Sequence, residues 1–303
     1  MFGKWFKKVI IFCLAIVILI PTILCIILFG KLNKLEKQMQ KLETRLLVEA
    51  YDSKESIGAV ASQQDEMEQN EVEDYTNSLS GNSASGNTVS ENKIHVYLTF
   101  DDGPSDNTDQ ILDILKEYNV KATFFVVGKS EKYTPLYRRI VEEGHSIGMH
   151  SYSHRYSEIY QDVESFGQDM KRLQQLIYDK TGVISNIYRF PGGSSNTVSK
   201  VDMGELIAYL GGQGITYYDW NVSSHDADNN NGELTVDDIV ESVTGNIQTR
   251  DNSIVLMHDA NDKRLTVEAL PIIIEKLQAM DHVEILPISE DTVKIQHTTL
   301  EEN

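Results

Sequence analysis

The sequence predicts an α/β fold built on a parallel sheet, either open or closed as a barrel. From residue 94 to residue 290, short apolar runs of strand length alternate with longer amphipathic stretches of helical periodicity. Strands that alternate with helices pair in parallel, because each helix carries the chain back to the same edge of the sheet. Charged and imidazole side chains also follow the strands at their ends, which is the edge where α/β barrels hold their sites.

The first strand is apolar and stops at the turn formed by Gly103 and Pro104. Strands are predicted, in order, at Val96–Phe100, Ala122–Val127, Ser146–Met149, Ile187–Phe190, Thr216–Trp220, Ser253–His258 and Val283–Leu286. Helices are predicted between them from apolar residues three and four positions apart. They cover Thr108–Tyr118, Tyr133–Glu143, Tyr156–Lys180, Lys200–Leu210, Thr235–Asn246 and Thr266–Met280.

The charge and the cysteine content exclude several classes. The formal net charge is −19, and we predict no nucleic-acid partner because such binding needs a basic surface. Both cysteines, Cys13 and Cys25, lie in the apolar N-terminal run. The rest of the chain can therefore hold neither a disulfide framework nor a cysteine metal site.

Residues 9–30 form an apolar run without a charged side chain, long enough to cross a hydrocarbon layer of about 30 Å. A cleavable signal peptide is the alternative, but its apolar region would be shorter and would end in small residues. This run ends at Leu28, Phe29 and Gly30, which favours a retained single-pass anchor behind a tail at residues 1–8. Lysines flank both ends of the run, so the charges do not fix its orientation.

Three further segments surround the folded domain. Residues 31–50 are predicted to form an amphipathic juxtamembrane helix, and heptad-spaced apolar residues leave dimerisation through residues 32–46 equally open. Residues 51–93 are rich in Ser, Asn, Gln and acids with little apolar mass to bury, which predicts a disordered linker. The domain is predicted to span residues 94–290, and residues 291–303 to form a C-terminal tail.

Two adjacent carboxylates, Asp101 and Asp102, end the first strand. Because neighbours on an extended chain point to opposite sides, one can bind a metal ion while the other takes up a proton. Asp102 with His150 and His154 offers one carboxylate and two imidazoles, a set that leaves a coordination position open for water. Asp-Asp-Gly-Pro is also ordinary turn chemistry, and two histidines at this spacing can simply lie on the surface.

Further polar residues lie where later strands end. Arg189 is a permanent, fork-shaped cation that can hold Asp101 ionised and oriented, or can form an ordinary salt bridge. His258 ends an apolar strand and can act as an acid toward a leaving group, or be a satisfied core histidine. Asp219 is predicted to hydrogen-bond to His258 and favour its protonated form. Trp220 either belongs to the core or stacks on a sugar ring.

Five short motifs occur in order and resemble those of the polysaccharide deacetylases of carbohydrate esterase family four, the NodB homology group. They read Thr-Phe-Asp-Asp-Gly at 99–103, His-Ser-x-x-His at 150–154 and Arg-x-Pro-x-Gly at 189–193. The fourth is carried by Asp219-Trp220 and the fifth by Leu256-x-His258. The resemblance covers residues 94–290, and five motifs in this order are highly specific. The fourth departs from longer versions, which carry further acids and an aromatic residue.

The resemblance implies a distorted (β/α) barrel with a bound Zn²⁺, for which Co²⁺ or a similar ion can substitute. It implies that Asp102, His150 and His154 are the metal ligands. It further implies that Asp101 is the catalytic base and that His258 is the catalytic acid.

The resemblance also implies roles for residues around this group. Asp219 matches the residue that tunes the acid, and Arg189 matches the one that orients the base. The backbone N–H near Gly192 is expected to help hold the oxyanion. Trp220 and Leu256 match walls of the acetate pocket.

The activity implied by the resemblance is removal of acetyl groups from a polysaccharide. With an anchor and a reaching linker, the expected substrate is N-acetylglucosamine in peptidoglycan, which places the short tail in the cytoplasm and the domain outside the cell. Chitin-type oligomers, poly-N-acetylglucosamine and O-acetylated xylan are the alternative substrates. The non-enzymatic alternatives are a silent carbohydrate-binding domain and a structural membrane protein dimerised through Leu32–Leu46. A silent domain would be expected to lack some of the site residues, and none is missing. The intact site also argues against a purely structural protein.

Overall fold

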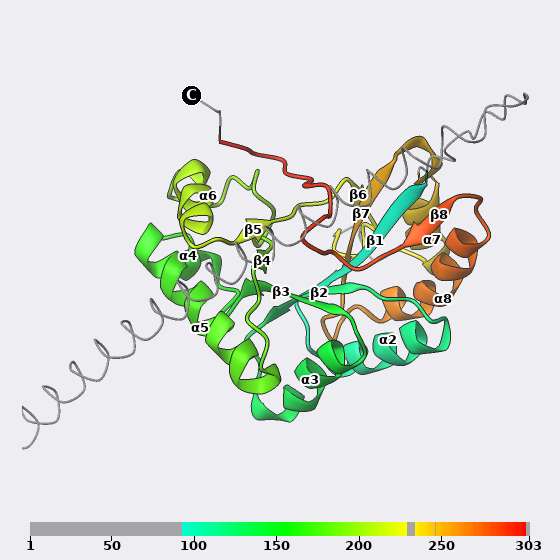
Figure 1. Cartoon of the computed structure of the whole chain (residues 1–303), viewed down its shortest axis with the longest axis horizontal. Helices are drawn as coiled ribbons and strands as arrows, with labels where there is room; N and C mark the ends of the chain where they lie inside the picture. The colour runs from blue at the N-terminus through cyan, green and yellow to red at the C-terminus, as the bar shows by residue number, and fades with distance from the viewer. Residues whose placement is uncertain (1–92, 229–233, 246, 301–303) are drawn as a thin grey trace, which may run out of the picture. The chain divides into compact units, whose positions relative to one another are not determined.

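The computed structural model describes residues 93–228, 234–245 and 247–300. These residues form a parallel sheet with the strand order β5-β4-β3-β2-β1-β7-β6, and β8 pairs with the first part of β1 (Figure 1). No strand pair among the described residues joins β5 to β6, so the sheet is curled but open, like half of a barrel. The predicted α/β class with a parallel sheet is confirmed, and the barrel is distorted to the point of being incomplete.

The strands are β1 (Ile94–Asp101), β2 (Thr123–Val127), β3 (Ser146–Ser151), β4 (Ile187–Tyr188), β5 (Thr216–Tyr217), β6 (Val222–Ser223), β7 (Asn252–His258) and β8 (Val283–Ile285). The helices are α2 (Asp106–Glu117), α3 (Thr134–Glu142), α4 (Tyr156–Ile159), α5 (Val163–Thr181), α6 (Met203–Gly212), α7 (Val236–Thr244) and α8 (Arg264–Gln278). Short 3₁₀ turns cover Glu131–Tyr133 and Ile247–Thr249.

Two predicted elements are divided in the structure. The helix expected over Tyr156–Lys180 is split into α4 and α5, because the side chain of Asp162 caps a new helix by accepting a hydrogen bond from the Ser165 N–H at 2.7 Å. The strand expected over Thr216–Trp220 ends as β5 at Tyr217, and the sequence analysis missed β6, the two-residue strand that follows it.

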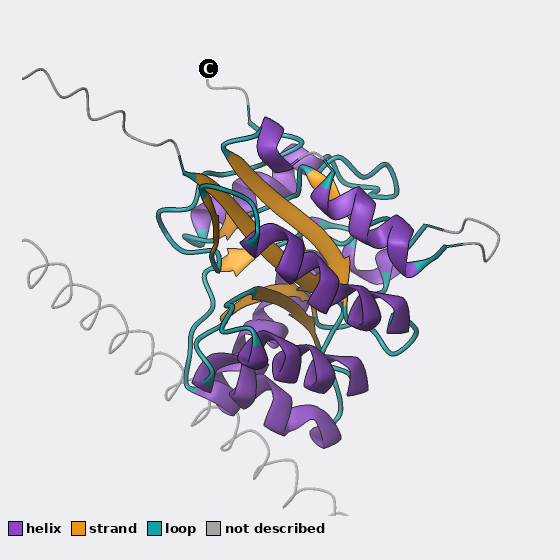
Figure 2. Cartoon of the chain, turned by 90° about the vertical axis from the view of Figure 1, so that its right-hand side faces the viewer, coloured by secondary structure: helices purple, strands orange, loops and turns teal. Residues whose placement is uncertain are grey.

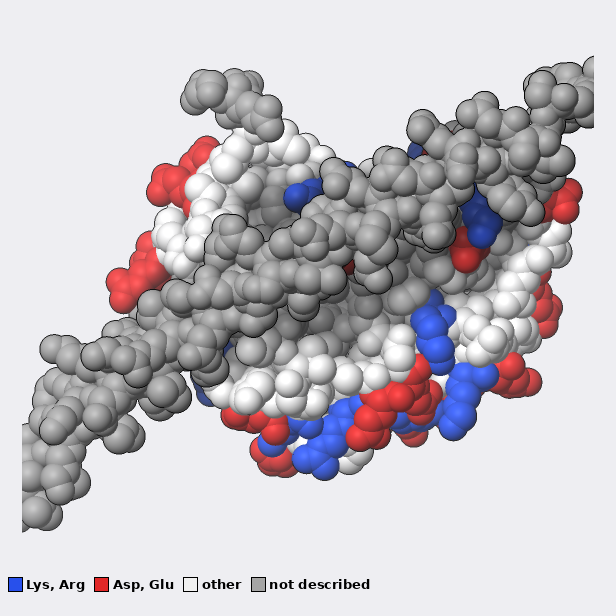
Figure 3. Space-filling view, viewed as in Figure 1, with Lys and Arg blue, Asp and Glu red and all other residues white. Residues whose placement is uncertain are grey.

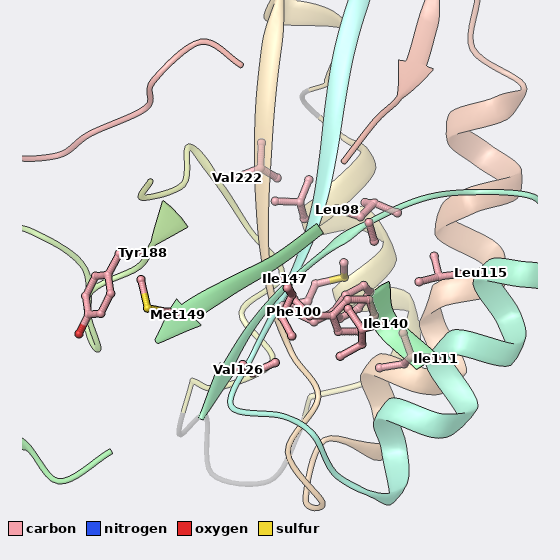
Figure 4. Packing of buried hydrophobic residues seen from close by; sticks show 14 of the residues in the cluster. Leu98, Phe100, Ile111, Leu115, Val126, Ile140, Ile147, Met149, Tyr188 and Val222 are labelled. Atoms are coloured by element: carbon pink, nitrogen blue, oxygen red, sulfur yellow. The ribbon is translucent and has the colours of Figure 1, made fainter. Parts of the chain in front are cut away.

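The two faces of β1 have different surroundings. Val96, Leu98 and Phe100 point into the larger core, where they meet residues of α2 and α3 such as Ile111 and Ile140 (Figure 4). Full burial of each such side chain stabilises the fold by about 1.5–3 kcal/mol. Figure 2 shows the helices wrapped around the outside of the strands.

The alternate residues of β1 point to the other face of the sheet. Tyr97 joins a smaller apolar cluster with Phe125 and Ile254, and further along the same face lie Thr99 and Asp101, both buried. The larger core therefore lies between sheet and helices, while the inner face carries the smaller apolar cluster and, toward the end of β1, polar groups.

The outer helices are linked by ion pairs. Arg139 of α3 contacts Asp109 and Asp113 of α2 at 2.7 and 2.5 Å, and Glu143 at 2.5 Å. Figure 3 shows Lys and Arg side chains interspersed with Asp and Glu along this rim. Because the two aspartates are exposed, their pairs with Arg139 contribute only about 0–1 kcal/mol each.

The described part of the predicted C-terminal tail, residues 291–300, is hydrogen-bonded to the domain. The Asp219 N–H donates to the Ile295 carbonyl at 2.8 Å, and the His297 N–H donates to Asp219 Oδ2 at 2.8 Å. The Tyr217 hydroxyl also donates to the Thr298 carbonyl. In Figure 1 this segment runs as a red strand-free trace from β8 toward β5. These hydrogen bonds therefore attach the C-terminal segment to β5 and to the turn that follows it.

Several predictions fall outside the described residues. They are the tail at 1–8, the anchor at 9–30, the helix at 31–50 with its dimer contact at 32–46, and the linker up to residue 92. Within the part of the chain that the structure describes, no helix is both long enough and apolar enough to cross a membrane.

Candidate functional site

The site begins where β1 ends. Asp101 is paired level with His258 across the β1–β7 ladder, so the first and fifth motifs meet at one edge of the sheet. Asp101 is 2% exposed and lies on the inner face. The next residue, Asp102, has φ 78, a left-handed conformation that Asp tolerates better than most residues. This turn directs the second carboxylate away from the strand and toward the loop after β3.

Asp102, His150 and His154 form the one group of possible metal ligands found among the described residues. Their ligand atoms all lie within 4.8 Å of one another. Asp102 Oδ1 is 3.6 Å from His150 Nε2 and 3.1 Å from His154 Nε2. The same Oδ1 atom is buried without a hydrogen-bond partner. A buried, unpaired carboxylate oxygen facing two imidazoles fits a divalent cation, so the structure brings together the three predicted ligands.

Each histidine is oriented by a backbone contact. His150 Nδ1 lies 2.7 Å from the Arg189 carbonyl, so Nδ1–H donates and Nε2 is left with its lone pair toward the cation. His154 has φ 52 and its N–H donates to Ser151 Oγ at 2.8 Å. The first histidine of the His-x-x-x-His pair therefore lies in β3 and the second in the tight loop that follows it.

Asp169 of α5, which the sequence analysis did not select, holds this loop. Its Oδ2 accepts from Ser151 Oγ and from the Tyr152 N–H, both at 2.7 Å, and its Oδ1 accepts from the Ser153 N–H at 2.9 Å. Three hydrogen bonds to consecutive residues fix the segment between the two histidines. No motif around Asp169 marks it in the sequence, because its role depends on the packing of α5 against β3.

The electrostatics suit metal binding. Burial by itself would raise the pKa of Asp102, but the imidazoles of His150, His154 and His258 outweigh it and lower that pKa. Burial, helped by the neighbouring His150, lowers the pKa of His154. The carboxylate is therefore ionised and His154 is neutral near pH 7, which are the forms that coordinate a cation.

Arg189 orients Asp101 as predicted. The guanidinium is fully buried, and its Nη1 donates to Asp101 Oδ1 at 3.0 Å and to Thr99 Oγ1 at 2.6 Å. Its Nε and Nη2 donate to the carbonyls of Tyr218 and Asp219, both at 3.0 Å. Each side of the planar fork thus has an acceptor, and the Asp101 carboxylate is held in one orientation.

The partner of His258 is Asp226, and the prediction of Asp219 is wrong. Asp226 Oδ1 lies 2.7 Å from His258 Nδ1, and Asp226 Oδ2 accepts from the His258 N–H at 2.8 Å and from Thr266 Oγ1 at 2.7 Å. Burial acts to lower the pKa of His258, but the hydrogen bond and charge of Asp226 outweigh it and raise the pKa to about 9. His258 is therefore protonated at neutral pH.

Asp219 was predicted in place of Asp226 because strand β6 was not recognised in the sequence. Ser223 of β6 is paired level with Leu256 of β7, which brings Asp226, three residues later, beside His258. Asp219 instead accepts from the Ser194 N–H at 2.8 Å and from the His297 N–H at 2.8 Å. It holds the loop after β4, which contains Gly192, to the C-terminal segment.

The three predicted substrate contacts, Gly192, Trp220 and Leu256, lie in the loop after β4, after β5 and on β7. Gly192 and Gly193 have φ values of +79 and +81, a region that L side chains rarely adopt. A Cβ at Gly193 would lie 3.0 Å from the Trp220 ring, so the bare backbone lets Trp220 pack there. Leu256 is paired level with Thr99 and shares the inner face with His258 two residues later. The structure describes where these residues lie, and their contact with a substrate remains a prediction.

Comparison with known proteins places the chain in a family. Residues 88–206 match the family described as polysaccharide deacetylase. A peptidoglycan-N-acetylglucosamine deacetylase of Bacillus cereus is 30% identical over 233 residues, covering 76% of this chain and 78% of the relative. The chain belongs to the polysaccharide deacetylase family. The predicted family and the predicted enzyme class, a hydrolase, are thereby confirmed.

Solved structures resemble this deacetylase as well. The catalytic domain of a peptidoglycan N-acetylglucosamine deacetylase from Eubacterium rectale has a TM-score of 0.65 and 37% identity, covering 71% of this chain and 97% of that one. A family 4 carbohydrate esterase from Streptomyces lividans, in complex with acetate, has a TM-score of 0.55 and 29% identity, covering 66% and 95%. The deacetylase thus shares its fold with both of these enzymes.

Proposed function

We propose that this deacetylase removes the N-acetyl group from N-acetylglucosamine residues of peptidoglycan. The observation that supports this most directly is the arrangement at the carboxyl ends of β1, β3 and β7. A metal-ligand group, a buried carboxylate and a protonated imidazole line one opening there. The choice of substrate rests on relatives, since the proteins from Bacillus cereus and Eubacterium rectale carry this activity in their names.

Zn²⁺ is the cation we propose for Asp102, His150 and His154, with Co²⁺ as a substitute. When bound there, a divalent cation polarises the acetyl carbonyl and lowers the pKa of a nearby water molecule. The chain's own part is to present the three ligands close together. The two histidines are held by the contact of His150 with the Arg189 carbonyl and by the hydrogen bonds of Asp169 to the loop between them.

In the proposed reaction, Asp101 takes a proton from the attacking water. Its position is set by Arg189, which holds one carboxylate oxygen and leaves the other free to accept. The N–H of Gly192 stabilises the negative charge that develops on the acetyl oxygen. His258 then donates its proton to the departing sugar nitrogen, and Asp226 stabilises the imidazolium until that transfer. Leu256 and Trp220 are proposed to enclose the acetyl methyl group.

We further propose that residues 9–30 anchor the protein in the cell membrane and that the catalytic domain lies outside the cell. The apolar run and the polar linker at residues 51–93 support this arrangement, because together they would let the domain reach the wall.

The test is acetate release by the full-length protein from purified peptidoglycan, compared with chitooligosaccharides, poly-N-acetylglucosamine and acetylxylan at matched acetyl concentration. We expect release from peptidoglycan to be fastest, and release from acetylxylan alone would replace the proposed substrate by an O-acetylated one. The matched control is Asp101→Asn, which keeps the three metal ligands. A protein that binds the glycan but releases acetate no faster than this variant would be a carbohydrate-binding domain instead.

A further inference from the structure

One aromatic side chain beside the metal ligands has no role in the scheme above. Tyr156 begins α4, two residues after His154, and the centroids of the two rings are 5.7 Å apart. On its other side the ring meets Tyr160 at 5.9 Å. Tyr156 is nevertheless 39% exposed. The phenol therefore has one part against a metal ligand and another part accessible to a bound molecule.

The hydroxyl of Tyr156 faces the loop that holds the proposed oxyanion donor. A Cβ added to Gly192 would lie 3.4 Å from Tyr156 Oη. Gly192 carries no side chain, and its φ of +79 disfavours one. The phenol oxygen and the bare backbone of Gly192 therefore lie close together, and the His154 ring lies against the Tyr156 ring.

The hydroxyl has no hydrogen-bond partner among the residues that the structure describes. The neighbouring Tyr160 differs, since its hydroxyl donates to the Pro191 carbonyl at 2.8 Å and so supports the same loop. A phenol is protonated at neutral pH and is a good donor. An unpaired donor at the edge of a site is available to a ligand at no cost in existing hydrogen bonds.

We propose that Tyr156 Oη, which lies beside Gly192, donates a hydrogen bond to the acetyl oxygen of the substrate as that oxygen becomes an oxyanion. This inference rests on the proposed function for the nature of the reaction, but not on which polymer carries the acetyl group. It makes Tyr156 a catalytic residue that acts in the transition state. The bond is stronger to the charged oxygen than to the neutral carbonyl, so it raises kcat more than it lowers KM.

The decisive variant is Tyr156→Phe in the full-length, metal-loaded protein. It removes one oxygen atom and no existing hydrogen bond, so the melting temperature and the metal content are expected to stay as in the wild type. Loss of one oxyanion donor lowers kcat by about 100-fold, with KM nearly unchanged. The matched control is Tyr178→Phe on α5, a tyrosine that is 48% exposed and far from the motif residues in sequence. That variant is expected to have wild-type kinetics.

Two acetyl donors distinguish a contact of Tyr156 with the acetyl oxygen from a contact with the sugar. The first is the polysaccharide that the wild type hydrolyses fastest, and the second is 4-nitrophenyl acetate, which carries the acetyl group without any sugar. A similar loss of kcat on both donors is the expected result. Wild-type kcat in the Phe variant, a rise in KM alone, or a loss confined to the polysaccharide would overturn the proposal, and the last two would assign Tyr156 to sugar binding. If wild type releases no acetate from peptidoglycan, the proposed substrate fails, while the comparison on 4-nitrophenyl acetate still decides the role of Tyr156.

Discussion

Replacing Asp226 by Asn tests the electrostatic design of the proposed acid. In the wild type, Asp226 raises the pKa of His258 to about 9 against the opposing effect of burial. Asn keeps the shape of the side chain but removes the charge. The pKa of His258 is then expected to fall toward its ordinary value of about 6.5, because only the charges of Asp101 and Asp102 still oppose the effect of burial.

The size of the effect follows from the two pKa values. At pH 8 an imidazole of pKa about 9 is about 90% protonated, whereas one of pKa about 6.5 is about 3% protonated. The proposed acid must be protonated to donate, so kcat/KM at pH 8 is expected to fall about thirtyfold. Below about pH 6 the loss should become small. A bound cation lowers the pKa of His258 in both proteins, so the prediction concerns the difference between them.

The assay is the pH dependence of kcat/KM between about pH 5 and pH 10. The expected result is that the basic limb moves to lower pH in Asp226→Asn and does not move in Asp219→Asn, the same chemical change in the residue first predicted for this role. Asp219 makes no hydrogen bond to His258 among the described contacts. Equal displacement of the limb in both variants, or none in Asp226→Asn, would refute the assignment of His258 and Asp226 as a pair.

Further predictions concern the same domain. A chelator is expected to abolish acetate release and added Zn²⁺ to restore it, whereas Asp101→Asn keeps bound metal by elemental analysis and loses turnover; activity indifferent to chelation would remove the cation from the scheme. Asp169→Ala is expected to weaken metal binding about 10- to 100-fold by competition titration, while Asp179→Asn on the same helix leaves it unchanged. Truncation after Glu290 removes the hydrogen bonds that Asp219 and Tyr217 make with residues 295–298, and at about 1 kcal/mol each it lowers the melting temperature by several degrees; an unchanged melting curve would contradict the packing of this segment. The stability that His258 gains from Asp226 is fully present below about pH 6.5 and lost as the pH rises through about 9, so Asp226→Asn should cost most at low pH in urea unfolding.

Site residues that lie close together in the sequence could be predicted correctly. Asp101 with Asp102, and His150 with His154, are neighbours or near neighbours in sequence, so strand alternation and loop spacing suffice to place them together. Arg189 and His258 could be added because each ends a predicted strand, and parallel strands end at one edge.

The sequence failed where position depends on a short element. β6 has two residues and no clear period, so Asp226 could not be aligned with β7 from spacing alone, and the nearer Asp219 was chosen. Asp169 and the C-terminal segment were missed for a related reason, because their contacts come from tertiary packing that no local pattern reports.

The corrected pairing also explains how one sheet edge can hold a base and an acid with opposite requirements. Asp101 and His258 are level on adjacent strands β1 and β7, close enough for their charges to influence each other. Each is also held from its outer side by a residue of opposite charge, Arg189 for the carboxylate and Asp226 for the imidazole. Arg189 holds the base in one orientation for proton uptake, while Asp226 keeps the acid protonated for donation. Removing the charge of either Arg189 or Asp226 should therefore disturb one proton transfer and leave the other intact. Single-turnover measurements at high and low pH can distinguish the two cases.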